Sequence, residues 1–160
     1  MKTNLIDLSK RVGSLLTSAN LTISTAESCT GGLLSHVLTG VSGSSAYFTG
    51  GVVAYSNRIK EEILEVRSTT LKENGAVSEE TAMEMAEGVR SRFKTDIGLS
   101  TTGIAGPTGG TPEKPVGLVW VGLSTTERTA AYECHFDVDR EEVKLLTVEK
   151  LLQLLIEEIK

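Results

Sequence analysis

Small nucleophilic and acidic side chains gather in one stretch of the sequence, Thr25 to Gly32 (Thr-Ala-Glu-Ser-Cys-Thr-Gly-Gly). This stretch follows a β-branched run at Leu21 to Ile23 and precedes an apolar helical pattern that begins at Leu33, which predicts a turn from a strand into a helix. Paired glycines allow a sharp turn, and the amides that open a helix can hold an anion or a polarised carbonyl. We expect this turn to form one wall of a small-molecule site.

Two serines are candidate nucleophiles, Ser28 in this turn and Ser45 in a second Gly- and Ser-rich loop at Thr39 to Ser45. Tyr55 at the end of a predicted strand and Lys60 in the first turn of a predicted helix could supply a base, if the fold brings them against either serine. The helix dipole and partial burial would lower the pKa of Lys60, and a neutral lysine can accept a serine proton. The spacing alone favours the structural alternative, a solvated Lys60 and a core Tyr55 with its hydroxyl at the rim.

Cys29 is a further candidate nucleophile, with His36 or His135 as its conceivable base, but no motif links them. Small buried cysteines are common structural residues, so an inert Cys29 is the stronger interpretation. Glu27 has three interpretations: it could orient a base, bind a ligand amide or hydroxyl, or accept hydrogen bonds from the amides of the turn. The sequence does not decide among them.

Composition narrows the class of protein. The net charge of −5 is unfavourable for a broad nucleic-acid surface, because such binding needs Lys and Arg against phosphates. No apolar stretch is long enough for a bilayer span and the first residues lack a signal-peptide core, so we expect a cytoplasmic protein without membrane or nucleic-acid partners.

The two cysteines and two histidines lack metal-ligand spacing, so we expect no metal and no other cofactor. The 160 residues fit a single domain over 1–160.

The elements that must position these residues alternate between helical and strand patterns. Strands are predicted after Leu21 and at Gly50 to Tyr55, Ile97 to Thr102, Val116 to Ser124 and Thr129 to Phe136, and helices from Leu5 to Asn20, after Gly32, and from caps at Asn57, Ser78 and Asp139. This order predicts a three-layer α/β/α sandwich with a mixed, mostly parallel sheet, to which the late hairpin adds one antiparallel strand. Ligands of such sheets bind beyond the carboxyl ends of the strands, where the Gly-rich loop 103–115 is also expected.

Several segments together resemble the CinA carboxy-terminal domain family. They are Thr25 to Gly32, Gly43 to Ser45, Val53 to Asn57 with Lys60, Gly75 to Glu79, Gly103 to Pro107 and Glu113 to Gly117. The match covers nearly the whole chain in order, so it is more specific than any single motif. The resemblance implies the three-layer fold, a homo-oligomer (dimer or higher) and, as in stand-alone members, a nicotinamide-nucleotide amidase.

The implied reaction is hydrolysis of the carboxamide of nicotinamide mononucleotide to nicotinate mononucleotide and ammonia, without a metal. By resemblance, the family's Ser, Tyr and Lys fall on Ser28 or Ser45, on Tyr55 and on Lys60. The serine would attack the amide carbon while Lys60 takes its proton with help from Tyr55. The alternative is a catalytically silent nucleotide-binding or regulatory domain that keeps the pocket but not the turnover.

Substrate contacts are expected from the turn, the Gly-rich loop and the last helix. The expected residues are Glu27 and Thr30 for holding the substrate, the amides of Gly31, Gly32 or Gly43 for the oxyanion, Thr30, Thr102 and Gly103 for the ribose phosphate, and Arg140 for its charge. These assignments depend on the fold bringing distant segments together.

Overall fold

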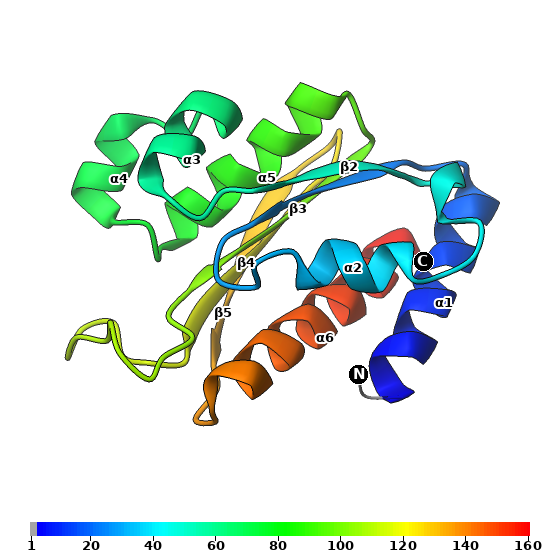
Figure 1. Cartoon of the computed structure of the whole chain (residues 1–160). Helices are drawn as coiled ribbons and strands as arrows, with labels where there is room; N and C mark the ends of the chain where they lie inside the picture. The colour runs from blue at the N-terminus through cyan, green and yellow to red at the C-terminus, as the bar shows by residue number, and fades with distance from the viewer. Residues whose placement is uncertain (1–2) are drawn as a thin grey trace.

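A five-stranded sheet lies between two layers of helices (Figure 1). The computed structural model describes residues 3–160. Its elements are α1 (Thr3–Ala19), β1 (Ile23–Glu27), α2 (Leu33–Thr39), the 3-10 turn η1 (Ser44–Ala46), β2 (Phe48–Val53), α3 (Asn57–Leu64), α4 (Ser68–Asn74), α5 (Glu79–Phe93), β3 (Ile97–Gly103), β4 (Leu118–Ser124), β5 (Thr129–His135) and α6 (Arg140–Ile159). Helices α1, α2 and α6 cover one face of the sheet, and α3, α4 and α5 cover the other (Figure 1).

The strands lie in the order β2-β1-β3-β4-β5. Strand β1 pairs in parallel with β2 and with β3, whereas β4 pairs antiparallel with both β3 and β5. Strand β4 therefore runs against the other four, which confirms the predicted mixed sheet with an antiparallel late hairpin. The carboxyl ends of β1, β2 and β3 meet at one end of the sheet, where the long β3–β4 loop extends outward in Figure 1.

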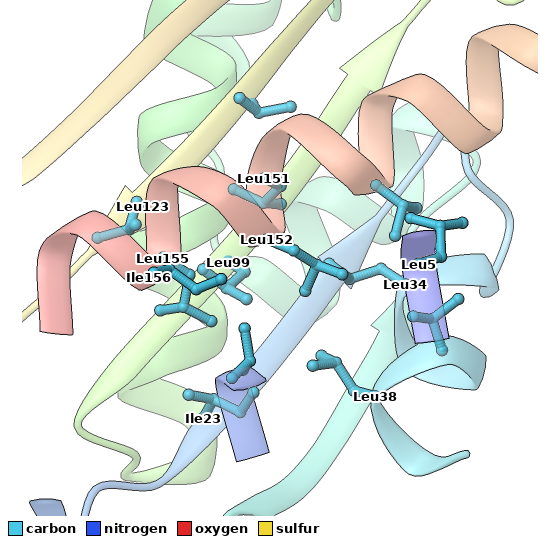
Figure 2. Close-up of a cluster of buried hydrophobic side chains, with 14 of the residues drawn as sticks. Leu5, Ile23, Leu34, Leu38, Leu99, Leu123, Leu151, Leu152, Leu155 and Ile156 are labelled. Carbon is cyan, nitrogen blue, oxygen red and sulfur yellow. The ribbon is translucent and has the colours of Figure 1, made fainter. Parts of the chain in front are cut away.

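Each face of the sheet has its own apolar core. The larger core joins α1, α2 and α6 to the sheet, and Figure 2 shows side chains from all three helices converging on it. Its labelled members are Leu5, Ile23, Leu34, Leu38, Leu99, Leu123, Leu151, Leu152, Leu155 and Ile156. A smaller core under α3 to α5 centres on Leu64, Met85 and Val89. Burial on both faces holds β1 and β3 rigidly, because closely packed interiors resist displacement.

Helix caps explain several boundaries. The side chains of Ser78 and Asp139 accept hydrogen bonds from the amides of Thr81 and Glu142, which confirms both predicted caps. The predicted cap of α3 was one residue out, because Ser56 accepts the amide of Ile59 and leaves Asn57 as the first helical residue.

One further expectation was wrong, and one helix was missed. The apolar run Gly50 to Tyr55 predicts a buried strand, whereas β2 is an edge strand that ends at Val53, and its residues alternate between half-buried and exposed, with Val53 51% exposed. Helix α4 was not predicted, because its short sequence Ser-Thr-Thr-Leu-Lys-Glu-Asn has no apolar stripe and its N-cap, Arg67, makes no side-chain cap.

In the part of the chain that the structure describes, no helix has both the length and the apolar character needed to cross a membrane.

Candidate active site

A pocket of about 340 Å³ opens at the carboxyl ends of the parallel strands. Its wall combines the turn after β1, the segment between β2 and α3, the start of the β3–β4 loop, and the first residue of α6. Ser28, Tyr55, Lys60 and Arg140 all line it. Residues that are far apart in the sequence therefore meet where the sheet order predicts a ligand site.

Ser28 and Lys60 are in direct contact. Ser28 is the first residue after β1, and Lys60 lies one turn into α3, where its side chain is only 1% exposed. Lys60 Nζ donates to Ser28 Oγ at 3.1 Å and to the carbonyl oxygen of Ala54 at 2.9 Å. Lys60 is thus a buried partner of a serine hydroxyl, and the solvated alternative for Lys60 was wrong.

Burial sets the protonation state favoured at Lys60. Desolvation lowers the pKa of the Lys60 ammonium below the ordinary value for a lysine. Both hydrogen-bond partners found for Lys60 Nζ in the described chain are neutral, so neither holds the positive charge in place. A neutral Lys60 can donate to Ala54 and accept the proton of Ser28, which is the arrangement that activates a serine.

Cys29 lies beside this pair but is not activated. Desolvation by burial raises the pKa of the Cys29 thiol to about 12. Only the thiolate is a strong nucleophile, so Cys29 is a neutral packing residue at ordinary pH. His36 and His135 are both exposed, and His135 hydrogen-bonds Glu133. The inert interpretation of Cys29 agrees with this environment.

Tyr55 and Arg140 form the mouth of the pocket. Tyr55 is 63% exposed, so it is not the core aromatic that the spacing alone favoured. Its hydroxyl accepts a hydrogen bond from Arg140 Nη2 at 3.3 Å, while Arg140 Nη1 donates to the carbonyl oxygen of Gly106 at 2.7 Å. Tyr55 shares the pocket with Lys60, but its hydroxyl is engaged by Arg140 rather than by the Ser28–Lys60 pair.

The charge of the pocket contrasts with that of the protein. Arg140 lines it, and no Asp or Glu is among its described lining residues. The protein as a whole has a net charge of −5. A cationic pocket in an acidic protein favours an anionic ligand, because the local positive potential attracts it.

Glu27 and Thr30 are inside the protein rather than in the pocket wall. Glu27 is fully buried, and its carboxylate accepts hydrogen bonds from the amides of Leu34 and Ser35, at 2.8 and 3.0 Å. Thr30 is also fully buried and donates to Glu27. Neither side chain lines the pocket, so the structure does not support a substrate contact for either of them. The amides in the first turn of α2, which could have held a ligand, already donate to the Glu27 carboxylate.

The glycine and threonine candidates divide into two groups. Thr102 and Gly103 line the pocket, although the Thr102 hydroxyl donates to the carbonyl oxygen of Ala76 and Gly103 is packed tightly against β4. A Cβ on Gly103 would lie 2.7 Å from Val119 Cγ2. Gly31 lies outside the pocket lining, and its amide donates to the carbonyl oxygen of Ser28. It is therefore engaged within the turn.

Ser45 and Gly43 lie at the opposite end of the sheet. They precede the start of β2, which pairs with the start of β1 through Ile23 and Phe48, whereas Ser28 follows the end of β1. The length of β1 separates the two ends by roughly 15 Å at the rise expected per strand residue. The structure therefore does not bring Ser45 to Lys60 or Gly43 to the pocket within one chain.

Several lining residues were missed by sequence reasoning. Asn57 lines the pocket, together with Ala76 and Val77 before α5 and with Ile104 to Gly106 from the Gly-rich loop, none of which was named as a site residue. Asn57 was interpreted as a helix cap, and the neighbouring Ser56, another strong capping residue, was the signal against that role. The Gly75 to Glu79 and Gly103 to Pro107 segments carried the family resemblance, which was the available signal for the rest.

Comparisons with known proteins agree with this architecture. The sequence model described as the CinA C-terminal domain matches residues 5–159. A competence-damage inducible relative from Halothermothrix orenii is 53% identical over 143 residues, which are 89% of this chain and 35% of that protein. A CinA-like protein from Salinibacter ruber is 53% identical over 135 residues, 84% of this chain and 33% of its own length. The chain thus spans about a third of these relatives.

Solved structures of similar length match almost end to end. A competence/damage inducible protein from Agrobacterium tumefaciens is 40% identical with a TM-score of 0.95, covering 98% of this chain and 96% of that one. A CinA superfamily protein from Escherichia coli is 33% identical with a TM-score of 0.93, covering 98% and 92%. The family match and these structures together show that the chain belongs to the CinA C-terminal domain family.

Proposed function

We propose that this domain is a nicotinamide-nucleotide amidase that converts nicotinamide mononucleotide to nicotinate mononucleotide and ammonia. The observation that carries the proposal is the buried contact of 3.1 Å between Ser28 Oγ and Lys60 Nζ. A serine beside a desolvated lysine is a nucleophile with its base, and acyl transfer from an amide uses both. The family resemblance supports the pyridine nucleotide as the particular amide.

The chemistry divides into acylation and deacylation. Ser28 Oγ attacks the carboxamide carbon and its proton passes to neutral Lys60. Lys60 then protonates the leaving nitrogen and the C–N bond breaks. Ammonia leaves, and the acyl group remains as an ester on Ser28 Oγ. Water attacks this ester, Lys60 accepts a proton from the water, and cleavage of the ester bond returns that proton to Ser28 and releases the carboxylate. No redox step is needed.

The charge and exposure of the pocket mouth support a phosphorylated substrate. Arg140 faces the pocket with its guanidinium held by neutral oxygens of Tyr55 and Gly106. A phosphate can replace these weaker partners with charge-assisted hydrogen bonds. The exposed ring of Tyr55 offers an aromatic face for the rest of the nucleotide.

Ammonia release from the phosphorylated and unphosphorylated substrates tests this proposal. We expect release from nicotinamide mononucleotide and a much higher KM for nicotinamide riboside. Replacing Arg140 with Gln should raise the KM for the mononucleotide by about tenfold to a hundredfold, the usual effect of losing a charge-assisted hydrogen bond. The KM for the riboside should barely change.

The control is Lys150→Gln, which removes a positive charge from α6 outside the pocket lining. It should leave both KM values unchanged. An equal loss for both substrates in Arg140→Gln would contradict a phosphate site at Arg140, and the absence of ammonia with either substrate would contradict the amidase.

The pH profile should report the depressed pKa of Lys60. Only the neutral amine accepts the proton of Ser28, so kcat/KM should rise with pH and level off as Lys60 loses its proton. Because burial lowers the pKa of Lys60, the midpoint should fall below the value of about 10.4 for a solvated lysine. The profile is best recorded above about pH 7, where the substrate phosphate is already a dianion. A midpoint at the solvated value would contradict this assignment.

A further inference from the structure

The carboxylate of Glu27 accepts hydrogen bonds from four donors on three residues. Oε1 accepts from Thr30 Oγ1 at 2.6 Å and from the amide of Leu34, and Oε2 accepts from the amide of Ser35 and from Ser35 Oγ at 2.7 Å. Glu27 is the last residue of β1 and directly precedes Ser28. The proposed nucleophile therefore directly follows a residue whose carboxylate accepts four hydrogen bonds.

A row of hydroxyl groups links this carboxylate to the backbone amide of Ser28. Thr30 Oγ1 lies 2.8 Å from Thr101 Oγ1, and the Ser28 amide donates to Thr101 Oγ1 at 3.3 Å and to the Thr101 carbonyl oxygen at 3.0 Å. All these atoms are buried. Thr101 pairs with Glu27 in the β1–β3 register, so the row crosses the two central strands.

The direction of each hydrogen bond follows from counting protons. A carboxylate only accepts, so the single hydroxyl proton of Thr30 must go to Glu27. Thr30 then has only lone pairs for Thr101, which must donate its own proton to Thr30. That leaves the lone pairs of Thr101 Oγ1 for its other two partners, the amide of Ser28 and the thiol of Cys29. Every bond in the row therefore points from Ser28 toward Glu27.

We propose that Glu27, Thr30 and Thr101 form a directed hydrogen-bond relay that positions the nucleophilic turn. This proposal deepens the amidase function and rests on it for its kinetic consequences. Bonds aligned in one direction polarise each other, which strengthens the hold on the Ser28 amide. A fixed amide keeps Ser28 Oγ beside Lys60, and small displacements of a reacting atom reduce the rate strongly. The three are positioning residues, because none touches the reacting atoms.

The two backbone amides that donate to Glu27 explain why a glutamate rather than a glutamine fits position 27. A glutamine of the same shape would turn its NH₂ group toward a backbone amide of Leu34 or Ser35, and two donors would then face each other in a buried site. Only an acceptor on both oxygens satisfies this turn.

Hydroxyl removal from Thr101 gives the kinetic test. Thr101→Val keeps the side-chain shape and the carbonyl acceptor but breaks the relay. We expect kcat to fall about tenfold with KM within about twofold, because orientation rather than binding is lost. Thr101→Ser should restore kcat. Combining Thr30→Val with Thr101→Val should cost no more than one of them alone, because both break the same row.

Ser100→Ala is the matched structural control. It removes a buried hydroxyl from the neighbouring position of β3, where Ser100 Oγ donates to the carbonyl oxygen of Ala82 at 2.6 Å under α5. It should reduce the thermal stability about as much as Thr101→Val and leave kcat unchanged. Equal effects of Ser100→Ala and Thr101→Val on kcat would show that β3 simply needs its hydroxyls, and would overturn the relay.

The Ser28 amide provides a readout that needs no substrate. Thr30→Val leaves both acceptors of this amide in place, so the relay predicts a change at an amide whose own hydrogen-bond partners are unaltered. We expect the Ser28 amide proton to shift upfield in the NMR spectrum and to exchange faster with solvent in Thr30→Val than in the wild type. An unchanged Ser28 amide would overturn the relay. If the wild type released no ammonia, the amidase would fail while this measurement still decided the relay.

Discussion

Replacing Ser28 with alanine is expected to lower kcat for ammonia release by about four orders of magnitude or more, the usual result of removing a nucleophile. Its hydroxyl lies 3.1 Å from Lys60 Nζ and Ser28 lines the pocket, so the proposed covalent intermediate cannot form without it. The fold should tolerate the change, since alanine keeps the Ser28 amide and its acceptors on Thr101. Steady-state kinetics with nicotinamide mononucleotide measures the loss.

Ser45→Ala is the matched control for this prediction. Ser45 is exposed on η1, at the end of the sheet opposite to the pocket. Its kcat should stay within about twofold of the wild type, the range of substitutions away from the reacting groups. Loss of activity in Ser45→Ala with retention in Ser28→Ala would reverse the choice of nucleophile, and would require a neighbouring subunit to bring Ser45 to Lys60.

Replacing Lys60 with methionine is expected to lower kcat by about three orders of magnitude, because Ser28 loses its only base in the described pocket. Methionine matches the length of the buried stem and cannot accept a proton. Binding of the nucleotide, measured by calorimetry, should weaken far less than kcat falls. A Lys60→Met variant that kept wild-type kcat would remove Lys60 from the mechanism.

The same variant should be more stable than the wild type at neutral pH, by roughly 1 kcal/mol, as is common when a strained functional group is removed. The sign follows from the depressed pKa of Lys60, since an unfolded chain binds this proton more readily than the folded one. Wild-type stability therefore increases as pH rises from the depressed pKa toward the ordinary lysine value. The advantage of Lys60→Met should shrink over that window, which denaturant unfolding at several pH values measures.

Most helices and strands could be predicted from the sequence, because apolar spacing and helix caps depend on residues that are close together in the chain. Apolar spacing located the long helices, and Ser78 and Asp139 cap α5 and α6 as expected from side-chain capping. Helix α4 was not predicted, because the stability of a short polar helix depends on tertiary packing, here of Leu71 against the smaller core. The edge position of β2 was not predicted, because the order of strands in a sheet depends on pairing between distant segments and cannot be deduced from the residues of one strand.

The site was predicted in outline but not in its assignments. Ser28, Tyr55 and Lys60 do meet in one pocket, as the carboxyl ends of the preceding strands suggested, and Arg140 at the start of α6 joins them. Choosing between Ser28 and Ser45 required the β1–β2 register, which places them at opposite ends of the sheet.

Glu27 shows the other limit of sequence reasoning. Its carboxylate belongs to the turn rather than to a ligand, which only the donors around it reveal. Tyr55 was expected to assist Lys60 but contacts Arg140, because the side chain points to the mouth of the pocket where it is exposed.

The amidase activity and the role of Ser28 are tested together by following ammonia and nicotinate mononucleotide in reactions of the wild type and of Ser28→Ala with nicotinamide mononucleotide. We expect equal amounts of the two products from the wild type, none above background from Ser28→Ala, and similar nucleotide binding by both proteins. Nucleotide binding without products from the wild type would contradict the amidase activity, and would identify the domain as the catalytically silent nucleotide-binding alternative.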